Sequence, residues 1–149
     1  MSTIFVKGNL FTYEGLQSLA HGCNCAGAMG RGIAVEFRSR FPNMYGEYKK
    51  LCLDGKFNPG DVFPWTENDI TIFNLGTQKH WKLKAEIWAI EKSLKEAIKI
   101  AKEKGIKNIG LPRIGAGLGG LSWEKVKEVF KIIGEETEIE LVVFEEFEK

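Results

Sequence analysis

The sequence predicts an α/β fold in which a largely parallel sheet is layered against helices. Short apolar runs typical of buried strands alternate along the chain with segments of helical periodicity. Two glycine-rich loops each lie between a predicted strand and a predicted helix, where parallel sheets usually bind ligands. The 149 residues, 44% of them hydrophobic, are enough for one core, so we expect a single domain over residues 1–149.

Two strands and two helices are predicted first. Ile4–Val6 and Leu19–Cys25 are short apolar runs, which indicate buried strands. Ile33–Phe41 has apolar residues at helical spacing, and Pro42 is expected to break this helix. Met44–Leu51 has the spacing of a further short helix.

A hairpin and a long helix follow. Asp61–Trp65 and Ile70–Leu75 have the composition of strands, and the polar segment between them that of a turn. Ile87–Ala101 carries apolar residues on one face and charged residues on the other, which predicts a surface helix. Gly105 lies just beyond, where helix ends favour a residue with positive φ.

The last segment is predicted to contain two strands, a glycine loop and a helix. Asn108–Leu111 is a short buried strand, and the loop Gly115–Gly120 follows it. Ser122 is expected to cap a helix that extends to Ile133. Leu141–Phe144 closes the chain as a strand.

Charge and targeting features exclude several classes of protein. The formal net charge is only +1, so any contact with nucleic acid would have to be local. No run approaches the length of a membrane span, and the first residues lack the features of a signal peptide, so we expect a cytoplasmic protein with no membrane contact. The three cysteines then predict reduced thiols rather than a disulfide framework.

The two glycine loops are candidate phosphate sites. Gly27–Gly32 and Gly115–Gly120 both leave backbone N–H groups free near the start of a helix, where the helix dipole favours an anion. One such loop alone would more simply be a tight turn. Two loops in matching positions favour a diphosphate held from both sides.

Three other motif interpretations fit less well. The second loop contains G-x-G-x-x-G, but too little chain follows it for the second half of a dinucleotide-binding sheet. Cys25 and Arg31 have the C-x₅-R spacing of cysteine phosphatases, but Asn24 stands where such enzymes usually carry histidine. His21, Cys23 and Cys25 alternate along a strand without the usual zinc knuckle, so we predict no metal site.

Three segments resemble successive signatures of a known family. They are Val6–Leu10, His21–Ala34 and Leu111–Leu118, and the resemblance covers nearly the whole chain. They resemble the macrodomains, which bind ADP-ribose. Within that family the chain is most similar to the branch of terminal ADP-ribose protein glycohydrolase and of the antitoxin glycohydrolases that act on DNA, the latter through Asn74–Trp81. The resemblance implies a three-layer α/β/α fold with a central mixed, largely parallel sheet.

The resemblance also implies how ADP-ribose would be held. The segment after the first strand would lie near the adenine with Phe144 as a stacking face, and the glycine loops would wrap the diphosphate and distal ribose. Asn9 replaces an acidic residue that most members carry, and its amide oxygen can still accept a hydrogen bond. The implied ligand-binding residues are Gly8, Asn9, Leu10, Asn24, Met29, Gly30, Arg31, Gly32, Ile33, Ala34, Thr77, Pro112, Arg113, Ile114, Gly115, Ala116, Gly117, Leu118, Gly119 and Phe144.

The implied catalytic groups depart from the family pattern. In this branch a lysine directly after the threonine at position 77 is associated with attack on the distal ribose, and some members carry an acidic residue in the second glycine loop. Gln78 and Gly119 occupy these positions here, and neither can act as a nucleophile or an acid–base group. Lys79 is one residue late, which places it on the opposite face of an extended segment unless a bulge intervenes.

His21, Asn24, Gln78 and Lys79 are therefore the candidate catalytic residues. His21 could act as general acid or base, or could be a hydrogen-bonded histidine on a buried strand. Asn24 and Gln78 could orient a water near the anomeric carbon. His80–Trp81 could contact the base or peptide next to the ribose, or pack at the start of a helix.

Three functions follow from the resemblance. The first is binding of ADP-ribose with hydrolysis of an ADP-ribosyl linkage on a protein or nucleic acid, by a monomer that uses no metal or cofactor. The second is an ADP-ribose 1″-phosphate phosphatase that depends on His21, because His21–Cys25 resembles a segment of macrodomain phosphatases. The third is a reader that binds ADP-ribosylated targets without consuming them.

Overall fold

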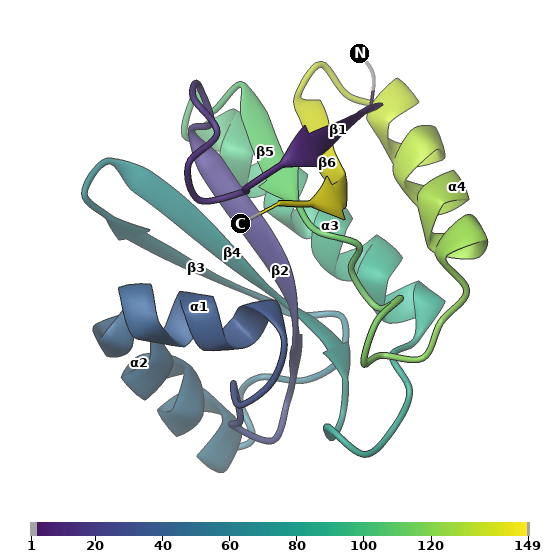
Figure 1. The fold of residues 1–149 in the computed structure, drawn as a ribbon. Coiled ribbons are helices and arrows are strands. Elements are labelled where there is room, and N and C mark those ends of the chain that lie inside the picture. Colours follow the sequence, from purple (N-terminus) through teal and green to yellow (C-terminus); the bar gives the residue numbers. More distant parts are fainter. Residues whose placement is uncertain (1–2, 149) are drawn as a thin grey trace.

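The computed structural model describes residues 3–148 and is built around a six-stranded sheet in the order β1-β6-β5-β2-β4-β3 (Figure 1). Neighbouring strands are parallel, except that β3 pairs antiparallel with β4. The predicted mixed, largely parallel sheet is therefore confirmed. The strands are β1 (Thr3–Gly8), β2 (Ser18–Asn24), β3 (Val62–Glu67), β4 (Ile70–Gln78), β5 (Asn108–Leu111) and β6 (Glu140–Phe147).

Helices cover both faces of this sheet. Ile72 of β4 packs in a core with residues of α1 and α2, whereas the next residue, Phe73, packs in a second core with residues of α3 and α4. Consecutive strand residues point to opposite faces, so the two cores lie on the two sides of the sheet. The three layers are those that the resemblance implied. The helices are α1 (Ile33–Arg40), α2 (Pro42–Leu53), α3 (Ile87–Glu103) and α4 (Trp123–Glu135).

Local details match the predicted signals with two differences. Asn68 and Asp69 have φ angles of 52° and 64°, the left-handed conformations that a tight hairpin turn needs. Pro42 follows α1 and is also the first residue of α2, a position where the missing N–H costs nothing, so this helix begins earlier than expected. Ser122 directly precedes α4 as predicted, but its side chain makes no capping hydrogen bond.

The topology gathers several loops at one edge of the sheet. β2, β4 and β5 are neighbouring parallel strands, so their carboxyl ends meet at the same edge. The first glycine loop follows β2, and the second lies between β5 and α4. Within the described range 3–148, no helix has both the length and the apolar content required to cross a bilayer.

Candidate functional site

A cleft composed of three connected pockets follows the carboxyl ends of β2, β4 and β5. The Asn24 pocket, of about 290 Å³, lies between the loops that follow β2 and β4. The glycine pocket, of about 250 Å³, lies between the two glycine loops. The Phe147 pocket, of about 560 Å³, lies beside the end of β6.

Shared walls connect the three pockets. Arg31, Gln78 and Leu118 line both the Asn24 pocket and the glycine pocket. Ile33 and Arg113 line both the glycine pocket and the Phe147 pocket. The three pockets therefore adjoin one another in a row from the end of β4 to the end of β6.

Most of the predicted ligand-binding residues line this cleft. Those that do are Asn24, Met29, Gly30, Arg31, Gly32, Ile33, Ala34, Thr77, Pro112, Arg113, Ile114, Gly115, Gly117, Leu118, Gly119 and Phe144. Gly8, Asn9, Leu10 and Ala116 line none of the three pockets. Asn9 instead closes a turn, because its Oδ1 accepts the N–H of Phe11 at 2.8 Å.

The ends of β2 and β4 place Asn24 beside Gln78. The register runs from Cys23 opposite Gly76 to Asn24 opposite Gln78, so a bulge in β4 passes over Thr77. Both Asn24 and Gln78 line the Asn24 pocket. The bulge does not bring in Lys79, which is exposed and lines none of the three pockets.

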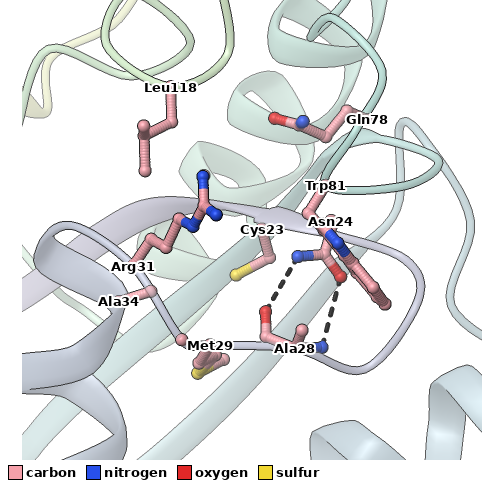
Figure 2. Close-up of a pocket in the computed structure, with 11 residues that line it drawn as sticks. Cys23, Asn24, Ala28, Met29, Arg31, Ala34, Gln78, Trp81 and Leu118 are labelled. Atoms are coloured by element: carbon pink, nitrogen blue, oxygen red, sulfur yellow. Dashed lines mark hydrogen bonds between the residues drawn. The ribbon is translucent and has the colours of Figure 1, made fainter.

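The Asn24 side chain closes the turn that forms the floor of its pocket. Its Oδ1 accepts the backbone N–H groups of Ala26 at 3.0 Å and Ala28 at 3.3 Å. Its Nδ2 donates to the carbonyl of Ala28 at 2.8 Å. Figure 2 shows Arg31 and Leu118 on one side of this pocket and Gln78 and Trp81 on the other. The Asn24 amide is thus fixed before any ligand binds.

The Gln78 side chain organises the loop that follows β4. Its Nε2 donates to the carbonyls of His80 at 3.1 Å and Leu83 at 2.7 Å. The His80 Nδ1 accepts the N–H of Lys82 at 3.1 Å, and the His80 and Trp81 rings lie 3.8 Å apart. Trp81 lines the Asn24 pocket and remains 48% exposed. Its ring is therefore available to a partner at the pocket mouth.

One cation lines the Asn24 pocket and three more lie on an adjoining loop. Arg31 lines it, and the loop that carries Trp81 also carries Lys79, Lys82 and Lys84. Across residues 3–148, none of these four forms an ion pair with a carboxylate. The loop that follows β4 therefore carries three lysines and one acidic residue, Glu86, in a chain whose net charge is only +1.

Close packing explains the glycine at position 119. A Cβ atom there would lie 2.6 Å from the carbonyl oxygen of Gly115, so any side chain would force the loop to open. The acidic residue found here in some macrodomains therefore does not fit this loop conformation. Gly32, the N-cap residue directly before α1, has a φ of 61°, a backbone conformation that residues with a side chain disfavour.

His21 lies in the core and lines none of the three pockets. It is fully buried, and its ring stacks on Phe37 at 3.8 Å. Asn74 Nδ2 donates to the Phe63 carbonyl, so Asn74 Oδ1 accepts from His21 Nε2–H at 2.7 Å. Burial lowers the pKa of His21 to about 4, so it is neutral at physiological pH. Its position is that of a hydrogen-bonded histidine on a buried strand, one of the two alternatives that the sequence left open.

The structure also disfavours a cysteine nucleophile. Cys25 lines none of the three pockets, and burial raises its pKa to about 12. A thiol with that pKa is not a thiolate at neutral pH. Among residues 3–148, no cluster of three or more His, Cys, Asp or Glu side chains is arranged to hold a metal ion.

Two aromatic positions differ from expectation. Phe144 lines the Phe147 pocket but is only 1% exposed and packs edge-on against Tyr13, so its ring lies in the floor. The exposed ring in that pocket is Phe147, at 44%.

Tyr48 of α2 lies in a segment that the sequence assigned only to a helix, and its hydroxyl contacts Asn24. In the sequence, Phe147 stands out as a lone aromatic residue in an acidic C-terminal segment, and this could have marked it as a ligand contact. No local feature of the sequence marks Tyr48 as a contact of Asn24.

Comparison with known proteins finds ADP-ribose glycohydrolases and, at 28% identity over 159 residues, an ADP-ribose 1″-phosphate phosphatase of Meyerozyma guilliermondii. The model of the Macro domain family matches residues 20–130. A DNA ADP-ribosyl glycohydrolase of Thermus aquaticus is 35% identical over 128 residues, which are 83% of this chain and 35% of that protein. A human ADP-ribose glycohydrolase is 32% identical over 140 residues, 94% of this chain and 89% of that protein. The chain spans about a third of the length of the DNA ADP-ribosyl glycohydrolases that it matches.

Solved structures of macrodomains superpose on most of this chain. The macrodomain of Thermus aquaticus DarG superposes with a TM-score of 0.86 at 33% identity, covering 96% of this chain and 97% of that one. Thermosipho africanus DarTG in complex with ADP-ribose superposes with a TM-score of 0.82 at 25% identity, covering 95% of this chain and 41% of that one.

Proposed function

Because the chain belongs to the macrodomain family, we propose that it binds ADP-ribose in the cleft and hydrolyses the bond between the distal ribose and a macromolecule. The observation that carries this proposal is the order of the three adjoining pockets. ADP-ribose is an extended molecule with an aromatic end, a central diphosphate and a terminal ribose. A row of pockets with an aromatic end, a glycine-rich centre and a polar end matches that order.

Each pocket supplies the chemistry that one part of ADP-ribose needs. The backbone N–H groups of the glycine pocket suit the diphosphate, and the Arg31 guanidinium at its wall adds positive charge. The exposed Phe147 ring suits the adenine. The remaining Asn24 pocket would then receive the distal ribose, with Asn24 and Gln78 beside its anomeric carbon.

The proposed reaction is direct hydrolysis. Water attacks the anomeric carbon of the distal ribose. The bond between that carbon and the macromolecule breaks, and its electron pair leaves with the macromolecule, which also receives the proton from the water. The bound diphosphate stabilises the cationic ribosyl centre as it forms. Gln78 and Asn24 orient the water through their amides, and neither provides an amine for a covalent intermediate. Lys79 and His21, which line no part of the cleft, take no part in this step.

The mouth of the Asn24 pocket favours a nucleic acid as the macromolecule. Trp81 offers a half-exposed ring on which a base can stack, and Lys79, Lys82 and Lys84 lie on the same loop to meet phosphates. In this proposal the protein acts as a monomer in the cytoplasm, without a metal ion or cofactor.

Calorimetric titration with ADP-ribose, using AMP and inorganic phosphate as controls, tests the binding site. We expect saturable binding much tighter than either control, because the diphosphate and distal ribose add contacts. Equal affinity for AMP would overturn the proposed use of the whole cleft.

Release of ADP-ribose from ADP-ribosylated single-stranded DNA, from ADP-ribosylated protein and from ADP-ribose 1″-phosphate tests the reaction. We expect free ADP-ribose from the DNA substrate at the highest kcat/KM. Tight binding with no release from any substrate would instead identify a reader, and turnover of ADP-ribose 1″-phosphate only, to ADP-ribose and phosphate, would identify the phosphatase.

A further inference from the structure

The geometry points to Tyr48 as a positioning residue for the Asn24 pocket, one that acts by holding Asn24 from behind. Tyr48 lies on α2, a helix that otherwise packs in the core and contributes no residue to the cleft. Its ring is fully buried and packs edge-on against Phe57 at 5.8 Å. This inference rests on the proposed function, because it assigns Asn24 to the reacting end of the ligand.

The Tyr48 hydroxyl contacts the Asn24 residue at two oxygens. It lies 2.7 Å from the Asn24 backbone carbonyl and 3.0 Å from Asn24 Oδ1, with the Ala28 carbonyl at 3.3 Å. Burial raises the pKa of Tyr48 far above its usual value, so the hydroxyl remains a donor at any working pH. The single hydroxyl proton is shared between the Asn24 backbone carbonyl, which is the nearer oxygen, and Asn24 Oδ1, so one donor links the backbone and the amide of Asn24.

The Tyr48 hydroxyl belongs to the set of donors that determines which atom Asn24 presents to the pocket. The backbone N–H groups of Ala26 and Ala28 donate to Oδ1, which requires oxygen, not nitrogen, at that position, and the shared Tyr48 proton lies on the same oxygen. One hydrogen of Nδ2 is taken by the Ala28 carbonyl. The second hydrogen has no acceptor among residues 3–148 and is the group that Asn24 offers to a water or ribose hydroxyl in its pocket.

Tyr45 provides a matched control on the same helix. Its hydroxyl donates to the carbonyl of Gly27 at 3.3 Å, on the same turn, but it makes no hydrogen bond to Asn24. Tyr48→Phe and Tyr45→Phe remove the same atom from neighbouring positions. Only the Tyr48 change should alter the orientation of the Asn24 amide.

The first test is a double-mutant cycle on the rate of ADP-ribose release. Each rate is divided by the fraction of protein molecules that bind ADP-ribose, so that misfolded protein does not count as a loss of activity. We expect Tyr48→Phe to lower kcat about tenfold, the worth of one hydrogen bond, while the affinity for free ADP-ribose stays within about twofold. In an Asn24→Ala background, Tyr48→Phe should have no further effect on kcat. Additive losses, or an equal loss from Tyr45→Phe, would show that Tyr48 acts only through stability.

The second test does not depend on turnover. NMR of the Asn24 side-chain amide should give the same chemical shifts for its two hydrogens in the wild type and in Tyr45→Phe, and shifted or broadened signals in Tyr48→Phe as the amide loses this hydrogen bond. Unchanged signals in Tyr48→Phe would overturn the inference. If the wild type releases ADP-ribose from no substrate, the proposed function fails, and this measurement alone still decides whether Tyr48 positions Asn24.

Discussion

Asn24 and Gln78 lie opposite each other at the last register position of β2 and β4, because a bulge in β4 passes over Thr77. Each amide is tied by its own hydrogen bonds to the loop that follows its strand. The two loops therefore form the two walls of one pocket.

A carboxylate at position 30 should block the ligand. Gly30 lines the Asn24 pocket, and a Cβ atom there meets no neighbour within 4 Å, so Gly30→Glu should fold. The new side chain would occupy the pocket assigned to the distal ribose and bring a negative charge toward the neighbouring diphosphate, so ADP-ribose binding, measured by calorimetry, should weaken by about 100-fold or more. Gly46→Glu adds the same charge at an open position on α2, outside the cleft, and should bind normally. Normal binding by Gly30→Glu would refute the site.

The wild type should form no imine with ADP-ribose. Gln78 has no amine, and Lys79 lies outside the cleft, so treatment with cyanoborohydride and substrate should leave the protein mass unchanged. Gln78→Lys places an amine in the Asn24 pocket and should be trapped as a covalent adduct. An adduct on the wild type that disappears in Lys79→Ala would show that Lys79 reaches the ribose.

Trp81 should set the affinity for a nucleic-acid substrate. Loss of a stacked base costs about 1–3 kcal/mol, so Trp81→Ala should raise KM for ADP-ribosylated single-stranded DNA by about tenfold. Free ADP-ribose, which has no base beyond the distal ribose, should bind with nearly the same affinity as to the wild type. Trp88→Ala is the control, because Trp88 is 52% exposed but lines none of the three pockets. Equal effects of the two variants would argue against stacking.

His21 should make folding stability depend on pH. Its pKa is about 4 in the folded protein and near its usual 6.5 when unfolded, so the unfolded state binds the extra proton between these values. The free energy of unfolding should therefore fall by about 3 kcal/mol as pH drops from 6.5 to 4, and this loss should stop below pH 4.

Urea unfolding at several pH values measures this effect. In His21→Gln the group that titrates is absent while Gln can still donate to Asn74, so stability should fall less steeply over the same range. The same dependence in both proteins would show that other groups cause it. At a pH where His21→Gln is fully folded, its kcat for ADP-ribose release should equal that of the wild type, because His21 is outside the cleft.

The sequence by itself determined the layers and the cleft. Strand composition and the amphipathic pattern of Ile87–Ala101 predicted the elements, because burial on one face leaves a periodic signal in the chain. The two glycine loops predicted the site, because their conformations follow from local backbone freedom and their position from the strand order. These are short-range properties, and the structure agrees with them.

Only the tertiary structure decided which side chains face the ligand. His21 and Asn24 are three residues apart on one strand, yet one is enclosed by Phe37 and Asn74 and the other opens into a pocket. A single bulge in β4 aligned Gln78 with Asn24 and left Lys79 outside. Tyr48 reaches the Asn24 turn from a helix 24 residues along the chain. Such relationships depend on packing between distant segments, which no local pattern in the sequence records.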